Sequence, residues 1–303
     1  ELVEQLHNAF SREDGLDLVS GGPPCQSFSM AGKREQNNDK NNLPWAFADF
    51  VDRTKPKVTL LENVTGILRA FKSESGESFH AWYEVAKVFA SIGYVPLCLH
   101  VNARHVGVPQ NRPRFIMIAV RSEHLSTFLE KCSSQDKELW SQPLSFFRKV
   151  QVQKEGLPFG HLDYIDSMKE KDAYKFSNTF LSHLVEHRYS EVSIKEAIDD
   201  LKVNKPSKAS GYICNLNNIF SQLNSHPKGL NHDLRNNSPL VQRRFRLYQI
   251  LQQLDDKPLT RRIFEILRGN ADTLSIEDWV KLSDFDFLHE NGELCKFSAK
   301  IAF

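Results

Sequence analysis

The sequence predicts an α/β fold in which a mostly parallel sheet is followed by a mainly helical region. Between residues 16 and 120, short apolar runs alternate with amphipathic stretches, as strands alternate with helices in such folds. After residue 123, most periodic stretches have helical spacing. The chain has 303 residues, 40% of them hydrophobic and 25% charged, which is the composition of a globular protein with a sizeable core.

Four short apolar runs are expected to form the strands. They are "LDLVS" (16–20), "KVTLLENV" (57–64), "YVPLCLHV" (94–101) and "RFIMIAV" (114–120). Amphipathic stretches between them predict helices over residues 43–56, where Pro56 ends the pattern, and over residues 78–93, where Gly93 ends it. Because helices separate the strands, we expect a mostly parallel sheet that is covered on both faces.

A domain boundary is expected near residue 123. Helical spacing is found in the first ten residues and, beyond the boundary, in residues 124–133, 191–202, 240–254 and 258–268. Polar loops separate these later stretches, and no repeat is evident among them. The sequence therefore predicts a first domain over residues 1–123 and a second, mostly helical domain over residues 124–303.

Charge, cysteine content and hydropathy narrow the class of protein. The net charge is +1, so any surface that binds nucleic acid must be local. The five cysteines are scattered and form no C-x-x-C pair, which argues against a disulfide framework or a zinc site and indicates a reducing compartment. No apolar run approaches the roughly 18 residues of a membrane span. These features favour a soluble protein of the cytoplasm.

Reactive side chains follow the ends of the predicted strands. Cys25 lies in "GGPPCQSFS" (21–29) after the first strand, and Glu62 lies near the end of the second. Carboxyl ends of parallel strands meet at one edge of a sheet, and Arg112 and Arg114 enter the fourth strand there. Each residue alone also has an ordinary explanation, as a buried thiol, a helix cap or an exposed charge. Together they would form a chemical site.

Three motifs resemble those of the C5-cytosine-specific DNA methyltransferases. "GGPPCQSFSMAGKR" is similar to the catalytic loop of that family, "LLENVTGI" to its ENV segment and "GVPQNRPRFIMIAV" to its Q-x-R-x-R segment. "NNLPWAFADFVDRTKPK" resembles the helix between the first two, and the order and spacing match over roughly residues 14–121. The resemblance implies a Rossmann-like methyltransferase fold, with a partial catalytic domain in residues 1–123 and a variable target-recognition region in residues 124–303.

The resemblance also implies a mechanism. The Cys25 thiolate attacks C6 of a cytosine that is rotated out of double-stranded DNA, so that C5 can take a methyl group. Glu62 donates a proton or hydrogen bond at N3, Arg114 holds O2, and Arg112 braces the loop and the Glu62 side. Further residues are implied to contact the substrate: Gly22, Pro24, Gln26, Ser27, Ser29, Asn63 and Gln110.

The methyl donor implied by the resemblance is S-adenosylmethionine. Pro24 is the one residue of this chain that the resemblance implies for binding it. The F-x-G-x-G stretch that carries much of the donor site in the family does not precede Cys25. Flanking sequence or a second chain is expected to complete the donor site. The implied setting is a bacterial restriction–modification system, with the enzyme in the cytoplasm on nucleoid DNA.

Other functions stay open on the sequence alone. The same motifs occur in members that methylate tRNA, and the incomplete donor site would also suit a non-catalytic or split DNA-binding subunit. A cysteine hydrolase would need a histidine base, for which His80, His100 and His105 are candidates without a supporting pattern. A basic stretch with His226, Lys228, His232, Arg235, Arg243, Arg244 and Arg246 is either a DNA-backbone contact or a solvated helix face.

Overall fold

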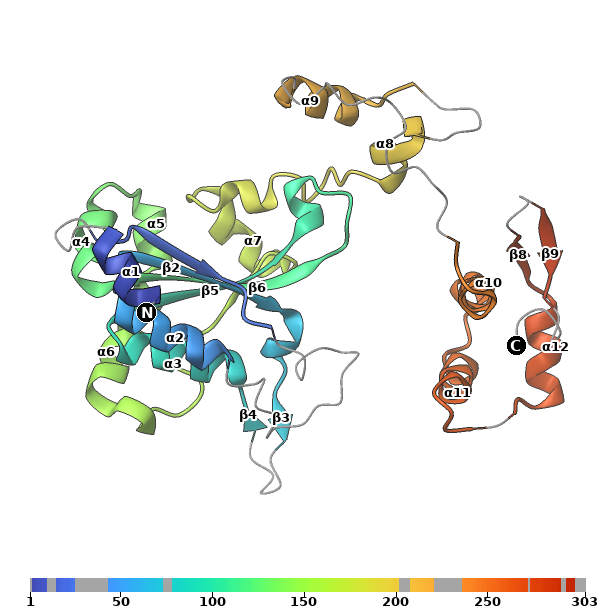
Figure 1. Ribbon diagram of the computed structural model, residues 1–303, viewed down its shortest axis with the longest axis horizontal. Coiled ribbons are helices and arrows are strands. Elements are labelled where there is room, and N and C mark those ends of the chain that lie inside the picture. Colours follow the sequence, from blue (N-terminus) through green and yellow to red (C-terminus); the bar gives the residue numbers. More distant parts are fainter. Residues whose placement is uncertain are drawn as a thin grey trace. The chain divides into compact units, whose positions relative to one another are not determined.

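The chain is described in a computed structural model (Figure 1). The described residues are 2–9, 15–24, 43–72, 78–201, 208–220, 236–271, 273–289 and 293–297. Contacts between residues divide the chain into two compact units, Glu1–Ser225 and His226–Phe303. None of the described helices combines the length and the apolar composition that a membrane-spanning segment needs.

The first unit is built on a sheet with five strands among the described residues. In spatial order these are β1 (Leu18–Gly21), β2 (Val58–Val64), β6 (Pro113–Arg121), β5 (Tyr94–Asn102) and β7 (Ile165–Asp166). β1 is parallel to β2 and β5 to β7, whereas β6 is antiparallel to both of its neighbours. All strands except β6 therefore point the same way, which confirms the predicted mostly parallel sheet. We call the edge at which their carboxyl ends lie the rim.

Three helices cover one face of the sheet. They are α2 (Leu43–Thr54), α3 (Ala81–Ser91) and α6 (Ser141–Gln153) (Figure 1). α3 buries Trp82, Val85 and Phe89, which are three and four residues apart, so one side of the helix is apolar. These side chains share a core with Phe115 of β6 and Phe146 of α6.

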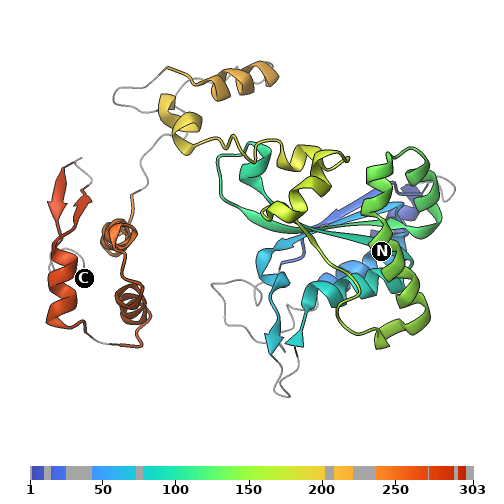
Figure 2. The ribbon, with the colours of Figure 1, turned by 180° about the vertical axis from the view of Figure 1, so that it is seen from behind.

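The opposite face is covered by α4 (Ser122–Glu130), α5 (Ser134–Leu139) and α7 (Glu170–Ser177), as Figure 2 also shows. Leu97 and Leu99 of β5 pack there with Trp140, which directly follows α5, and with Phe176 of α7. Every residue of β5 is buried. This agrees with its near-continuous apolar sequence, which predicted a strand inside a sheet that is covered on both faces. Both faces are therefore covered, as expected.

The division into units falls at a different place from the predicted boundary near residue 123. Helix α6 packs Phe146 and Val150 into the same core as Phe89, and β7 extends the sheet beside β5. These contacts tie the chain beyond residue 123 to the sheet, and the division lies after Ser225. The assignment of residues 124–303 to target recognition stays a prediction.

Short elements complete the first unit. They are α1 (Leu2–Ala9), β3 (Phe71–Lys72), β4 (Ser78–Phe79), α8 (Ile194–Ile198), α9 (Gly211–Ile219) and the 3-10 turns η2 (Thr65–Leu68), η3 (Ala103–Val106), η4 (Lys154–Gly156), η5 (Ser182–Val185) and η6 (Asp199–Leu201). Turn η2 begins directly after β2, and η3 directly after β5. Two of the strands that reach the rim therefore end in a tight turn.

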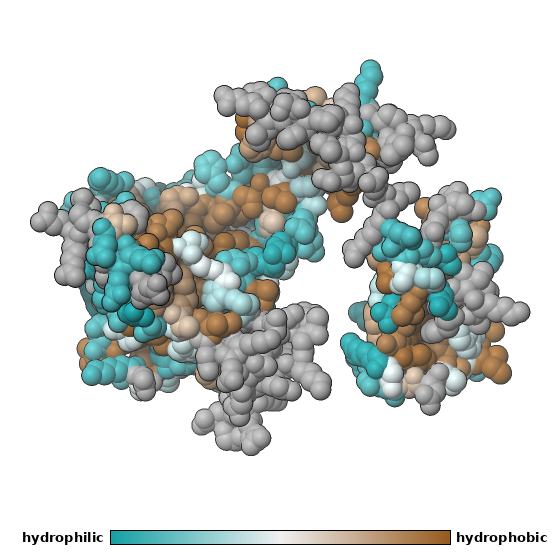
Figure 3. Space-filling view, in the orientation of Figure 1, coloured by the Kyte–Doolittle hydropathy of each residue, from teal (hydrophilic) through white to brown (hydrophobic). Residues whose placement is uncertain are grey.

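The second unit has a core of its own. It consists of α10 (Pro239–Gln253), α11 (Lys257–Leu267), α12 (Ile276–Ser283) and the two-stranded sheet β8 (Asp286–Leu288) and β9 (Leu294–Lys296). Leu247, Ile263 and Phe287 are among the side chains buried in it. Hydrophobic residues also reach its surface (Figure 3), including Phe245 and Ile276, whose side chains are exposed. α10 and α11 confirm the helices predicted over residues 240–254 and 258–268.

Candidate active site

The ends of β2 and β6 bring a carboxylate and a guanidinium together at the rim. In the pairing of these strands, Glu62 is opposite Ile116 and Val64 is opposite Arg114. Because side chains alternate along a strand, Glu62 and Arg114 project from the same face of the sheet, one diagonal step apart. Their charged groups form an ion pair, with 2.6 Å between Nε of Arg114 and Oε1 of Glu62.

The Glu62 carboxylate also lies beside the segment that follows β1. A Cβ atom added at Gly22 would lie 3.2 Å from Oε2 of Glu62, so the glycine leaves room for this close approach. The side chain of Glu62 is 41% exposed and that of Arg114 is 20% exposed. The pair is therefore accessible to a molecule at the rim, next to the chain that leads into Cys25.

Asn63 holds the same segment from the buried side. Its side chain projects from the other face of β2 and is buried, since the residues of a strand alternate between faces. Its Nδ2 donates to the carbonyl of Pro23 at 3.2 Å, and its Oδ1 accepts from the N–H of Val64 at 2.8 Å. Asn63 was expected to contact the substrate, but its amide is used to anchor the segment after β1.

Several predicted residues lie outside the described part of the chain. These are Cys25, Gln26, Ser27 and Ser29 of the catalytic-loop motif, and His226, Lys228, His232 and Arg235 of the basic stretch. Pro24 is the last described residue before Cys25, and it is exposed. Their roles stay predictions.

The two arginines of the Q-x-R-x-R motif differ in position. Arg114 lies within β6 and contacts Glu62, whereas Arg112 precedes the strand and is exposed. The expectation that Arg112 braces Glu62 is therefore not met among the described residues, because β6 begins at Pro113 and only Arg114 is held next to β2. Gln110 is also exposed, and its N–H donates to the carbonyl of Val108 at 2.7 Å.

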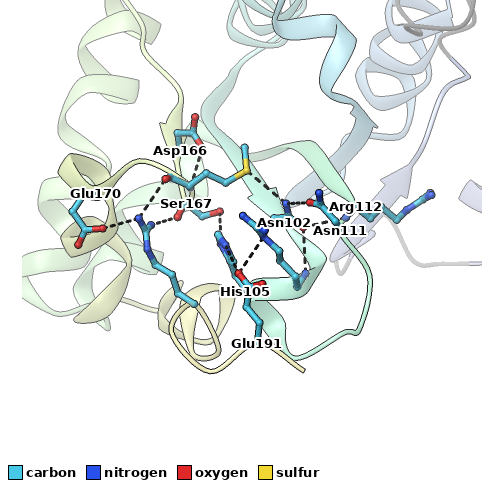
Figure 4. A network of polar contacts seen from close by, with 11 residues as sticks. Asn102, His105, Asn111, Arg112, Asp166, Ser167, Glu170 and Glu191 are labelled. Atoms are coloured by element: carbon cyan, nitrogen blue, oxygen red, sulfur yellow. Dashed lines mark hydrogen bonds and ion pairs between the residues drawn. The ribbon is translucent and has the colours of Figure 1, made fainter. Parts of the chain in front are cut away.

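Sequence reasoning missed Asn102, the last residue of β5. Its side chain is buried, and its Oδ1 accepts from the N–H of Arg112 at 3.1 Å and from the N–H of Arg104 at 3.3 Å (Figure 4). Its Nδ2 donates to Oδ1 of Asn111 at 2.8 Å. An asparagine that ends a strand before a tight turn is a known signal for such side-chain to backbone bonds.

A second acid–base pair lies on β5 and β7. Nδ1 of His100 is 3.1 Å from Oδ1 of Asp166, and both side chains are buried. Burial alone would raise the pKa of Asp166, but the hydrogen bonds from His100 and from the N–H of Met168 (3.0 Å) hold that pKa below its ordinary value. Asp166 and the neighbouring Ser167 belong to the polar network in Figure 4.

The three histidines considered for a hydrolase are engaged in other contacts. The His80 ring is stacked on Phe159 with 3.6 Å between ring centroids, and burial lowers its pKa. His100 pairs with Asp166. His105 is buried beside Ser167, and burial, followed by the charges of nearby arginines, lowers its pKa. In the described part of the chain, none of the three is therefore an exposed base.

The described residues offer little of a site for S-adenosylmethionine. Gly21 is required by packing, since a Cβ there would lie 2.5 Å from Cε2 of Phe47. Asp17, the acidic residue just before β1, pairs with Lys57, with 2.7 Å between Oδ1 and Nζ. Pro24, the residue implied to contact the donor, is exposed. These residues do not form a donor site by themselves.

The basic helix of the second unit is only partly available for DNA. Arg246 lies over the ring of Phe287, with 5.6 Å from Cζ to the ring centroid, and one of its terminal nitrogens lies 3.2 Å from Nε2 of His289. Nε of Arg243 donates to the carbonyl of Pro239 at 3.4 Å. Arg244 is exposed. Of the three, Arg246 therefore helps to pack the unit.

Comparison with known proteins gives the family. The profile described as "C-5 cytosine-specific DNA methylase" matches residues 3–271, so the chain belongs to that family. This agrees with the resemblance of the three motifs, which include Glu62 and Arg114 at the rim.

Curated relatives show where the similarity lies. The chain is 38% identical over 108 residues to type II methyltransferase M.DdeI of Desulfomicrobium norvegicum. The aligned residues cover 36% of this chain and 25% of that relative. It is 37% identical over 109 residues to M.HindV of Haemophilus influenzae, with 36% and 33% covered. For M1.HphI of Haemophilus parahaemolyticus the values are 32% over 164 residues, with 52% and 42% covered. The chain thus spans less than half the length of these relatives.

Proposed function

We propose that this chain carries the base-attacking part of a DNA cytosine-5 methyltransferase of restriction–modification type. The observation that supports this most is the position of the Glu62 carboxylate. It pairs with Arg114 and lies against Gly22, in the segment that leads into Cys25. Similarity to type II methyltransferases supports the restriction–modification setting.

The proposed chemistry begins with Cys25. Its thiolate forms a bond to C6 of cytosine, and the electrons of the C5–C6 double bond move through the ring toward N3, which takes a proton. C5 then has the character of an enamine carbon and can attack an electrophile. Loss of the proton from C5 to a base, breakage of the S–C6 bond and return of the N3 proton to Glu62 restore the aromatic ring, the thiolate and the proton donor.

Glu62 and Arg114 are proposed to act on the opposite side of the ring. Glu62 supplies the proton or hydrogen bond at N3, and Arg114 holds O2, where negative charge develops. The ion pair keeps both groups within reach of one base at the rim. Backbone carbonyls of Gly22 and Pro24 are proposed to accept from the 4-amino group, which would distinguish cytosine from thymine.

The substrate is proposed to be double-stranded DNA, with the target cytosine turned out of the helix. A base inside a duplex cannot be reached by a thiol, and flipping costs a few kcal/mol that contacts to the DNA must offset. Gln110 and Arg112, which are exposed in the loop before β6, are proposed to face the DNA. A DNA substrate in a bacterium would place the protein in the cytoplasm, on the nucleoid.

S-adenosylmethionine is the methyl donor that family membership suggests. Its site is proposed to need residues beyond those described, from the rest of the protein or from a second chain. Attack on C6 and proton transfer at N3 need only the base and the side chains named above.

The experiment that tests this proposal does not depend on the donor. Duplex DNA with tritium at C5 of cytosine is incubated with the chain, and release of tritium to water is measured. Addition of Cys25 to C6, protonation of C5 by water, loss of the tritium from C5 and elimination of the thiolate would exchange the label. Cys25→Ser is the matched variant, because it replaces the thiol by a hydroxyl of similar size that is a far weaker nucleophile.

We expect the wild-type chain to release tritium and Cys25→Ser to release none while still binding the DNA. Equal release by both would overturn the role of Cys25. Release from labelled tRNA but not from DNA would replace the DNA substrate by RNA. Bisulfite sequencing of genomic DNA from cells that express the chain with its natural flanking sequence would then give the target motif.

A further inference from the structure

The loop between β5 and β6 carries Gln110 and Arg112 and leads directly into Arg114. It spans residues 103–112 and begins with η3. Backbone hydrogen bonds close it: the N–H of Ala103 donates to the carbonyl of Arg112 at 3.1 Å, and the N–H of Val108 donates to the carbonyl of Ala103 at 3.2 Å. The loop therefore has one defined shape, which fixes where its exposed side chains lie.

Asn102 fastens both ends of this loop with a single side chain. Its Oδ1 accepts from the N–H of Arg104 near the start of the loop and from the N–H of Arg112 at its end. Its Nδ2 donates to Asn111 and lies 3.6 Å from Sδ of Met168. Asn102 is 1% exposed, so without its side chain these two N–H groups would lose their partner in a place where water has little access.

The outer side of the loop rests on the segment around His187. The N–H of His187 donates to the carbonyl of His105 at 2.8 Å, and a Cβ at Gly107 would lie 2.9 Å from Cδ2 of His187. Gly107 has a φ of +84°, so a side chain there would be strained as well as crowded. Nε of Arg104 lies 3.3 Å from Oε1 of Glu191. The outer contacts touch the first half of the loop.

The second half, Gln110 to Arg112, is held from the inside by Asn102. We propose that Asn102 is a positioning residue: it sets the entry into β6 and thereby the place of Arg112 and Arg114 relative to Glu62. This inference rests on the proposed function for its catalytic consequence. That Asn102 holds the loop is inferred from its hydrogen bonds alone and does not depend on the proposed function.

Three variants separate positioning from a general loss of structure. Asn102→Ala removes the acceptor for both N–H groups. Asn102→Asp keeps an acceptor oxygen for them, and Asn111 can turn its amide to donate to the new carboxylate. Asn111→Ala is the matched control, because Asn111 is exposed and its loss leaves the bonds to Arg104 and Arg112 in place.

Two readouts are needed, and only one depends on the proposed function. The first is hydrogen–deuterium exchange of peptides that cover residues 103–112, compared with peptides from α3 and α6. The second is the rate of tritium release from C5 of cytosine in duplex DNA, measured together with DNA affinity and the temperature of unfolding.

For Asn102→Ala we expect faster deuterium exchange in residues 103–112 only, and a tritium-release rate about tenfold to a hundredfold lower at similar DNA affinity. Asn102→Asp should recover most of the rate. Asn111→Ala should stay within about threefold of the wild type.

Each contrary result has a distinct meaning. Unchanged deuterium exchange in Asn102→Ala would show that the side chain does not hold the loop. Faster exchange with a wild-type rate of tritium release would show that the loop does not position the arginines. Equal losses of rate and of DNA affinity would make Asn102 a merely structural residue. If the wild-type chain releases no tritium while the loop is protected from exchange, the proposed function fails and the catalytic role of Asn102 falls with it.

Discussion

Two acid–base pairs lie near the rim, on opposite faces of the sheet, and they differ in access. Glu62 and His100 each lie two residues before the end of a strand, in β2 and β5 respectively, and these strands point the same way. Glu62 pairs with Arg114 across to β6, and His100 pairs with Asp166 across to β7. The distance from the end of the strand therefore does not distinguish the two pairs.

Burial does distinguish them. The Glu62 and Arg114 side chains are 41% and 20% exposed, whereas those of His100 and Asp166 are 6% and 7% exposed. The ring of Tyr164 lies edge-on to His100, with 6.2 Å between ring centroids. A ligand can reach the first pair, and the second is closed off by packing. The comparison suggests that the first pair serves chemistry and the second serves stability.

The largest expected effect is that of Glu62→Gln on catalysis. The amide keeps the size of the side chain but cannot deliver a proton to N3, so tritium release from C5 should fall about 10²- to 10⁴-fold. The free energy of unfolding should change by less than about 1 kcal/mol, because the pair is partly exposed. Tritium release and urea unfolding of the same preparation measure both. A loss of stability as large as that of a buried pair would remove the distinction between the two regions.

Arg114→Lys should have the next largest effect. Lysine keeps the charge but loses the planar fork that can hold Glu62 and O2 together, so the rate should fall about tenfold to a hundredfold. Arg112→Lys is the control at an exposed position outside β6 and should lose less. The ratio of the two tritium-release rates is the quantity to compare. A larger loss at Arg112 would transfer the base-binding role to the loop.

The difference between these arginines shows what the sequence could and could not predict. The strand ends predicted that Glu62, Arg112 and Arg114 lie at one rim, but the contact with Glu62 was expected from Arg112 and is made by Arg114. Simple alternation places Arg112 and Arg114 on the same face and cannot rank them. The structure separates them because β6 begins at Pro113, which pairs with Asn102 of β5. Arg112 therefore lies outside the paired residues of the strand.

β7 and the bond from Arg112 to Asn102 were beyond prediction for a related reason, whereas the bond from Arg104 is the local one that an asparagine before a turn signals. β7 has two residues, too few for any periodic pattern, and it exists because β5 offers a free edge next to Ile165. Asn102 reaches Arg112 across ten positions of irregular loop, where no local rule applies. Helices and long strands were predictable because their apolar spacing is repeated several times.

Asp166→Asn should reduce stability rather than catalysis. Its carboxylate lies 3.1 Å from Nδ1 of buried His100 and accepts from the N–H of Met168, and loss of the charge should lower the free energy of unfolding by about 2 kcal/mol near pH 7. The folded pKa of Asp166 lies below its ordinary value of 3.8. The charge therefore stabilises the fold above that value, and the contribution is lost as the pH falls through the lower folded pKa.

Urea unfolding of the wild type and of Asp166→Asn at several pH values tests this. The gap in unfolding free energy should be constant between about pH 7 and pH 5 and should shrink below about pH 4. A gap of the same size at the lowest pH would mean that shape, and not charge, accounts for the loss. Tritium release by the variant, measured where it is fully folded, should stay close to that of the wild type.

The smallest expected effect is that of Lys169→Ala, which removes the exposed cation beside the buried pair. Nζ of Lys169 is 3.7 Å from Oδ2 of Asp166 and 5.3 Å from the ring centroid of Tyr164, and its side chain is 48% exposed. Exposed ion pairs contribute about 0.5 kcal/mol and are weakened by salt, so the loss should be of that size and should fade at high ionic strength. A loss equal to that of Asp166→Asn would mean that the solvent-facing lysine, and not buried His100, keeps Asp166 charged. The second pair would then depend on an exposed group, as the first does, and burial alone would no longer separate the pair proposed for chemistry from the pair proposed for stability.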